Sequence, residues 1–296
     1  MAGDATSTLL PHAPEELTNS RLSRLGEGVG KVVYASEHWV VKRERSPTEV
    51  VAIIVLWKLL RKLERVLPGN IGKRLSQRPS RQIRFLRVVV QGCMLVVPKS
   101  VWFTTHIAQT WRIYHKRDVR GERLANEILA GTSLVPERVC FPPVRVNVRG
   151  WPGWLNVSEA TERVEATLHE RLTRLAADED FEQIEQWLDR FLKLRQSGWQ
   201  RGLFSLDAHL KNFGVCGNHV VLLDTGGLTN RWSEIERKLD SEQEASEPHT
   251  RLGLGPILAR RPDIAQRFNT RWRQLVSTAG VRDHWPGAQG LNTSQA

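Results

Sequence analysis

Two carboxylates and one amide lie close together in the second half of the chain, on either side of a predicted β-hairpin. Asp207 and Asn212 precede the first of two short apolar runs, and Asp224 follows the second. Cys216–Asn218, which separates the runs, contains the glycine and asparagine that tight hairpin turns favour. Because the hairpin folds back on itself, we expect Asn212 and Asp224 at the same end of the two-stranded ribbon.

The residue types in this set meet the requirements of phosphoryl transfer. A carboxylate can accept the proton of a substrate hydroxyl, while an amide oxygen and a second carboxylate hold the magnesium ions that neutralise a triphosphate. We therefore predict that Asp207 is catalytic and that Asn212 and Asp224 bind Mg²⁺. Apolar residues at steps of three and four predict a helix over about residues 180–196 that stops at Gly198, and a loop then carries Asp207.

A glycine-rich turn near the N-terminus is a second motif that suits phosphate binding. Gly26, Gly28 and Gly30 lead into an apolar strand, and the next strand, Trp39–Lys42, ends in a lysine. Taken alone, a glycine cluster is more often an ordinary turn and a strand-end lysine is more often a solvated charge. Together with the distal carboxylates they predict a phosphate site, because glycine lets backbone N–H groups approach phosphates and Lys42 can pair with them.

The order of these motifs resembles the protein-kinase-like superfamily, and more closely its small bacterial members, the aminoglycoside phosphotransferases and the lipopolysaccharide-core sugar kinases. The resemblance covers Leu22–Glu44 and residues 118 to about 229. It implies an α+β, two-lobed fold with a small β-rich N-terminal lobe and a mainly helical C-terminal lobe. It also implies ATP and Mg²⁺ as cofactors and a hydroxyl of a sugar, glycolipid or other small molecule as the phosphate acceptor.

The resemblance assigns further site residues between the two motifs. Gly121–Pro136 looks like the regulatory helix of these families and the Val-Pro turn after it. Glu122 best matches the glutamate that orients Lys42, and Glu127 is the alternative. Five residues on a helix turn roughly 140° around its axis, so only one of the two can face the lysine. Glu159 falls where the family's hinge contacts adenine.

The sequence also departs from the family pattern. Ser205 replaces the usual histidine, Leu206 replaces the arginine that reads activation-loop phosphorylation, and Thr225 stands where protein kinases have phenylalanine. The glycine turn is shifted, with Lys31 at the usual third glycine and Gly30 just before it. Ser205 keeps a second interpretation open, a kinase-like pseudoenzyme that binds nucleotide and acts as a membrane- or partner-docked regulator. The presence of Asp207, Asn212 and Asp224 together favours an active enzyme over a pseudoenzyme.

The positive charge is concentrated in one segment. Between Val50 and Arg117 there are 14 Lys and Arg residues and one acid, Glu64, so this segment carries +13 while the whole chain carries +11. We interpret residues about 46–117 as a helical basic insertion in the N-terminal lobe. One predicted helical face gathers four of its cations, namely Lys58, Arg61, Lys62 and Arg65.

Three interpretations suit such a face. An amphipathic basic helix suits an anionic membrane surface, and a helix packed on the core with a solvated basic face is equally favoured. Nucleic acid is the least favoured partner, because no nucleic-acid-binding module accompanies the charge. Ser100–Trp111, the longest run within this segment without Lys, Arg, Asp or Glu, is too short to span a bilayer.

These features divide the chain into four segments. We expect an N-terminal extension over residues 1–20, the N-terminal lobe over 21–160, the C-terminal lobe over 161–280 and a disordered tail over 281–296, which is rich in polar residues and glycine. The three cysteines lack C-x-x-C spacing, and no secretion signal precedes residue 17. We therefore expect a cytoplasmic protein, peripheral at the inner face of the membrane if the basic segment binds lipid.

Overall fold

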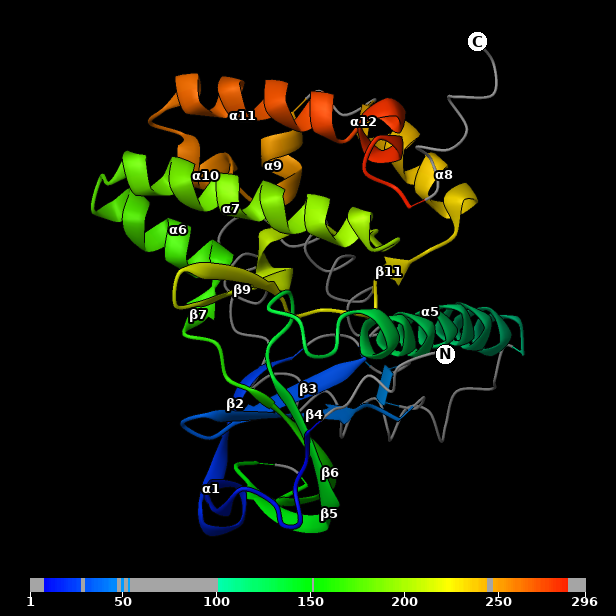
Figure 1. The fold of residues 1–296 in the computed structure, drawn as a ribbon. Helices are drawn as coiled ribbons and strands as arrows, with labels where there is room; N and C mark the ends of the chain where they lie inside the picture. Colours follow the sequence, from blue (N-terminus) through cyan, green and yellow to red (C-terminus); the bar gives the residue numbers. More distant parts are fainter. Residues whose placement is uncertain are drawn as a thin grey trace, which may run out of the picture.

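The computed structural model describes residues 8–27, 30–46, 49–50, 53, 101–150, 152–243 and 247–286. Gly28 and the basic residues Lys58, Arg61, Lys62 and Arg65 lie outside these ranges, as does the end of the chain from residue 287. The described chain is an α+β structure in which a β-rich part is followed by a mainly helical part (Figure 1).

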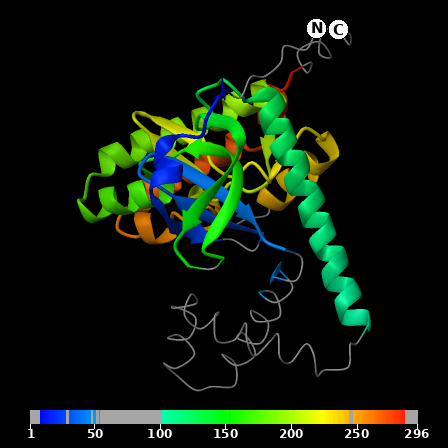
Figure 2. The same cartoon turned by 90° about the horizontal axis from the view of Figure 1, so that it is seen from below.

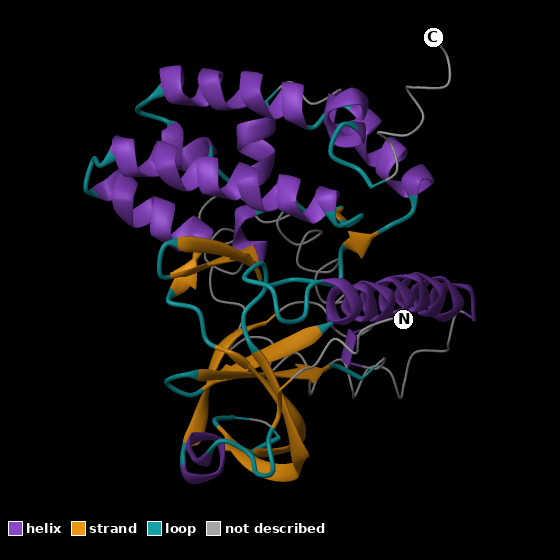
Figure 3. Ribbon diagram, viewed as in Figure 1, coloured by secondary structure: helices purple, strands orange, loops and turns teal. Residues whose placement is uncertain are grey.

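A six-stranded sheet forms the first of these, which we call the sheet part (Figure 3). Its strands are β1 (Thr8–Leu9), β2 (Arg21–Glu27), β3 (Lys31–Ala35), β4 (Trp39–Glu44), β5 (Arg138–Val148) and β6 (Trp154–Glu162). They follow the order β1-β5-β2-β3-β4-β6, and β5 also pairs with β6. Side chains alternate between the faces of a strand, so Val32, Tyr34 and Val41 enter the core of the sheet part, while Lys31 and Lys42 face the other side.

The predicted N-terminal extension contributes to this core. Strand β1 pairs in parallel with β5, and helix α1 (Glu15–Asn19) buries Leu17 completely. From Thr8 onward the extension is therefore built into the sheet part.

Seven helices of the described chain follow β6 and form the helical part. They are α6 (Leu168–Ala177), α7 (Phe181–Gln200), α8 (Trp232–Gln243), α9 (Pro248–Leu252), α10 (Gly255–Leu258), α11 (Pro262–Leu275) and α12 (Thr278–Arg282). The apolar stripe of α7 supplies Ile184, Leu188 and Phe191 to the core. Phe191 stacks on Trp272 of α11, with ring centroids 6.0 Å apart. Helices α7 and α11 thus lie along each other (Figure 1).

Helix α7 is longer than the sequence predicted. It begins where expected, with Asp180 capping the Gln183 N–H at 3.1 Å, but it continues through Gly198 to Gln200. The reason is tertiary, since Trp199 is 1% exposed and stacks on Phe204. Burial of this ring keeps the last turn helical, and it outweighs the low helix propensity of glycine.

The predicted hairpin is confirmed. Strands β9 (Phe213–Cys216) and β10 (His219–Leu222) pair antiparallel across a turn in which Gly217 has φ +54°. Three short strands surround it, namely β7 (Ala166–Thr167), β8 (Phe204–Ser205) and β11 (Leu228–Thr229). Strand β7 pairs with β9, and β8 pairs with β11.

Helix α5 (Val101–Ile128) lies between the two parts. Its 28 residues make it about 42 Å long at 1.5 Å per residue, and its N-terminal end extends away from both parts (Figure 2). The predicted end of the basic insertion near residue 117 falls inside this continuous helix, so the insertion is not separate from the segment that carries Glu122. Within the described residues, no helix has both the length and the apolar character needed to cross a membrane.

The predicted disorder of the tail from residue 281 is corrected for residues 281–286. Val281 in α12 is fully buried, and Trp285 packs edge-on against Trp232 with ring centroids 5.8 Å apart. These apolar contacts order the chain in spite of its polar composition.

A bidentate ion pair fastens α5 to the helical part. Arg120 donates to both carboxylate oxygens of Glu234 in α8, at 2.9 and 2.6 Å, and the Thr229 hydroxyl donates to the same carboxylate at 2.7 Å. The hydrogen bonds from Arg120, aided by Thr229, hold the pKa of Glu234 below its usual value. A carboxylate with a lowered folded-state pKa stabilises the fold above its unfolded pKa, and the contribution is lost as the pH falls through the lowered value.

We predict that Glu234→Gln lowers the free energy of unfolding by about 1–3 kcal/mol at neutral pH, because it weakens a charge-assisted hydrogen-bonded set. The difference from the wild-type protein should shrink as the pH falls below the unfolded pKa. Urea unfolding from neutral pH to about pH 3 measures this. The matched control is Glu127→Gln, which alters an exposed pair with Arg123 on the same helix; a loss of the same size there would contradict the prediction.

Candidate functional site

A cleft of about 740 Å³ lies between the sheet part and the helical part. Its volume is within the roughly 300–1,000 Å³ typical of small-molecule sites. Val33 and Val40 line it from the sheet, and Leu222 lines it from the opposite side. Its charged and amide side chains include Lys31, Lys42, Glu122, Glu159, Asn212 and Asp224.

Backbone hydrogen bonds hold Asn212 and Asp224 together. Asn212 ends a short 3₁₀ helix (Leu210–Asn212), and its carbonyl oxygen accepts from the N–H groups of Leu223 at 2.9 Å and Asp224 at 3.3 Å. The Asp224 carboxylate in turn accepts from the Gly226 N–H at 3.0 Å. The expected proximity of Asn212 and Asp224 is therefore confirmed, and its cause is the hairpin register.

Asp207 lies beside the cleft and is not part of its lining. The Leu206 N–H donates to the Gly227 carbonyl at 2.9 Å, so the Asp207 loop is tied to the segment that follows Asp224. The exposed Asp207 carboxylate accepts from the His209 N–H at 3.1 Å. A hydroxyl-bearing molecule could reach this carboxylate without entering the cleft.

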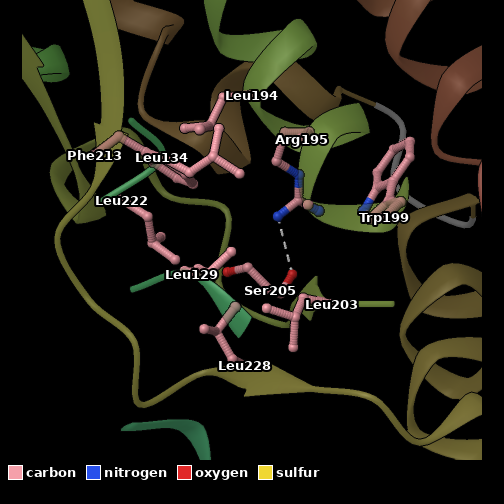
Figure 4. A pocket seen from close by; sticks show the side chains of 11 residues that line it. Leu129, Leu134, Leu194, Arg195, Trp199, Leu203, Ser205, Phe213, Leu222 and Leu228 are labelled. Atoms are coloured by element: carbon pink, nitrogen blue, oxygen red, sulfur yellow. Dashed lines mark hydrogen bonds between the residues drawn. The ribbon is translucent and has the colours of Figure 1, made fainter. Parts of the chain in front are cut away.

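Ser205 supports the backbone of the Asp207 loop. Its hydroxyl donates to the Asp207 carbonyl at 2.9 Å, and its own carbonyl accepts from the buried Arg195 at 3.1 Å (Figure 4). The cavity around these two residues measures about 30 Å³ and is lined mainly by leucine and aromatic side chains. It is too small for a substrate, so Arg195 and Ser205 hold the loop from behind.

Two of the three predicted glycines are described. Gly26 is at a bulge in β2, opposite Val33, and a Cβ there would meet no atom within 4 Å. The Gly30 carbonyl accepts from the Arg45 N–H at 2.7 Å, which fixes the exit of the turn. The third, Gly28, lies outside the described residues.

The predicted pairing of Glu122 with Lys42 is wrong. Glu122 accepts a hydrogen bond from Lys31, and Glu127 pairs with Arg123 on the exposed side of α5 at 2.7 Å. Lys31 follows Gly30 at the start of β3, and its long side chain reaches the helix. Lys42 instead donates to the Leu223 carbonyl at 3.1 Å, directly before Asp224.

The two lysines are perturbed in opposite directions. Burial acts to lower the pKa of Lys31, but the hydrogen bond and charge of Glu122, with the charges of Asp118 and Asp224, outweigh it and raise that pKa. Solvent reaches Lys42 through the open cleft, yet protein atoms crowd its ammonium group. This burial and the neighbouring Lys31 charge lower the pKa of Lys42.

Asp118 is a member of this charged set that the sequence analysis missed. It is half-buried, and its burial and the charges of Asp224 and Glu122 raise its pKa. The signal was its position four residues before Glu122, one helical turn away and on the same face of α5. Its carboxylate occupies the space where a side chain at Gly226 would lie.

Helix α5 touches the Asp224–Gly226 segment backbone to backbone. A Cβ at Gly121 would overlap the Thr225 carbonyl oxygen and would lie 3.0 Å from the Gly226 carbonyl. Only glycine permits this approach, so residue 121 sets the distance between the helix and the segment that presents Asp224.

Glu159 does not lie at a hinge. It is inside β6, opposite Cys140, and its carboxylate pairs with Arg138. Strand β6 ends at Glu162, and the chain crosses into the helical part at residues 163–165. The prediction for Glu159 is therefore wrong, because β6 extends through Glu162 and is longer than expected.

The predicted metal ligands are one amide and one carboxylate, Asn212 and Asp224. Within the described ranges there is no group of three or more His, Cys, Asp or Glu that could hold a metal ion. Mg²⁺ commonly binds to one or two carboxylates and to substrate phosphates, and it keeps several waters. Asp224 and Asn212 fit that mode.

Comparisons with known proteins identify no relative: no protein-family model, no curated protein and no solved structure matches the chain.

We predict that Gly121→Ala destabilises the protein by about 1–3 kcal/mol, because the added methyl overpacks a backbone contact. It should also weaken any ligand held by Asp224, since the helix and the segment must move apart. Differential scanning calorimetry measures the first effect.

Gly198→Ala is the matched control, because it also replaces a glycine inside a helix. A Cβ there would lie 3.5 Å from the Leu203 carbonyl, an ordinary contact. Alanine's higher helix propensity should make this variant as stable as the wild-type protein or up to about 1 kcal/mol more stable. Equal destabilisation of both variants would contradict the close-approach argument.

Proposed function

We propose that the protein is an ATP- and Mg²⁺-dependent phosphotransferase with a two-lobed, protein-kinase-like fold, and that it acts on a hydroxyl of a sugar, glycolipid or other small molecule. The observation that carries the proposal is the meeting of strand lysines with Asn212 and Asp224 in one cleft. Phosphoryl transfer depends on positioning and on charge neutralisation, and this set can provide both.

The position of each residue in or beside the cleft indicates its proposed role. The lysines lie on the sheet side of the cleft, where they can hold phosphate oxygens. Asn212 and Asp224 lie opposite and would hold Mg²⁺, which supplies the charge neutralisation when bound. Asp207, outside the lining, would orient the acceptor hydroxyl and accept its proton.

The support of the Asp207 loop favours the enzyme over a pseudoenzyme. Loss of the family's histidine would disfavour catalysis if the loop lost its internal hydrogen bonds. The Ser205 hydroxyl and the Arg195 guanidinium both bond to the backbone of this loop. Ser205 therefore supplies a structural substitute, and the main argument for an inactive site is weakened.

The first test of the proposal is nucleotide binding. ATP with Mg²⁺ should raise the melting temperature, and the rise should grow with ligand concentration as mass action requires. Asp224→Ala should reduce the rise, because it removes a magnesium ligand. The absence of any rise at millimolar ATP would sink the proposal.

The second test separates catalysis from binding. Asp207→Asn should lower turnover by roughly 10²–10⁴, the usual contribution of a general base, and should leave the affinity for ATP unchanged. ATP consumption in the presence of a panel of sugars, aminoglycosides and glycolipids measures turnover. Asp240→Asn, on the exposed face of α8, is the control and should match the wild-type protein. Wild-type turnover in Asp207→Asn would remove Asp207 from the mechanism.

A further inference from the structure

We infer that Lys31, held by Glu122, is a phosphate-binding residue of the cleft and shares this role with Lys42. The inference rests on the proposed function, because it takes the ligand to be a nucleoside triphosphate. It assigns to Lys31 a phosphate-binding role that the sequence analysis predicted for Lys42 alone.

The strand register places both lysines on the cleft face of the sheet. Val33 pairs with Lys42 across β3 and β4, and Lys31 lies two residues before Val33 on the same face. The two lysines are therefore diagonal neighbours, and such positions are roughly 7–8 Å apart. Both side chains line the cleft. Two cations at this spacing can hold neighbouring phosphate groups of one chain.

Glu122 fixes Lys31 in place. The ion pair is half-buried, with side-chain exposures of 21% for Lys31 and 35% for Glu122. An ammonium group carries three N–H donors, and Glu122 takes one of them. The carboxylates of Asp118 and Asp224 also favour the charged form of Lys31. Lys31 thus remains a charged donor at the mouth of the glycine turn.

The surroundings of Lys42 favour the binding of a polyanion. Its ammonium group is crowded by protein and lies near a second cation, and both effects oppose its charge. Phosphate oxygens between the two lysines would screen this repulsion and satisfy donors on both. Lys42 is also tied to the Leu223 carbonyl, so phosphates held there lie next to Asp224 and its magnesium ion.

The competing explanation is that the Lys31–Glu122 pair only joins β3 to α5. A pair of this kind would contribute to stability and would not distinguish ligands with phosphates from ligands without them. The distinguishing measurement is therefore the affinity for ATP with Mg²⁺ compared with the affinity for adenosine, which lacks phosphates.

The experiment is isothermal titration calorimetry of the full chain with ATP and Mg²⁺, and separately with adenosine. Lys31→Met should weaken ATP binding at least tenfold and leave adenosine binding unchanged. Lys31→Arg, which keeps the charge, should restore part of the affinity. Glu122→Gln should weaken ATP binding less than Lys31→Met, because the main effect of Glu122 on the phosphates is to position Lys31. Lys193→Met, which alters an exposed lysine of α7, is the control and should bind both ligands like the wild-type protein.

Each outcome decides between the two claims. A wild-type protein that binds no ATP overturns the proposed function itself. A wild-type protein that binds ATP, with Lys42→Met weakened and Lys31→Met unchanged, overturns only the role of Lys31. Equal loss of ATP and adenosine binding in Lys31→Met shows a structural role and also overturns it. If Lys31→Met does not fold, Lys31→Gln, which retains a donor toward Glu122, carries the same comparison.

Discussion

The arrangement of the cleft depends on the backbone contact between Gly121 of α5 and the Thr225–Gly226 peptide. Two chain segments more than 100 residues apart in sequence meet there without side chains between them. A contact of this kind is set by hard repulsion and cannot be relaxed by a change of rotamer. The position of Asp224, and with it the helical side of the cleft, depends on where α5 lies.

Charged pairs on either side of this contact hold the helix in place. Glu122 reaches the sheet part through Lys31, and Arg120 reaches the helical part through Glu234. The pairs come from positions two residues apart, which point to different sides of a helix. Helix α5 is therefore tied to both walls of the cleft at the level of Gly121.

Patterns that depend on neighbouring residues could be predicted from the sequence, and contacts between distant segments could not. The β9–β10 hairpin follows from a local turn signal, and it brought Asn212 and Asp224 together as expected. The partner of Glu122 was missed, because the reach of Lys31 depends on how α5 crosses the sheet. Asp118 was missed because its position one helical turn before Glu122 becomes informative only once Glu122 is placed beside Lys31.

The same limit applies to the ends of elements. Glycine at residue 198 correctly indicated weak local helix propensity, but the core contact made by Trp199 decides where α7 ends. The chain after residue 280 has the composition of a disordered tail, yet the burial of Val281 and the packing of Trp285 against Trp232 order its first residues. Composition indicates the conformation that a segment prefers in isolation. Packing of an apolar side chain against the core can override that preference.

The length of α5 gives the cleft a mechanical connection to the segment before it. Between Val101 and Gly121 the helix spans about 30 Å, and it is pinned at one end of that span. A tilt of about 5° around the pinned end displaces Val101 by about 2.6 Å. The helix is thus a lever whose pivot lies next to Asp118 and Glu122, and whose long arm runs back to Val101. A force applied at the Val101 end is transmitted as torque to Asp118 and Glu122 at the cleft.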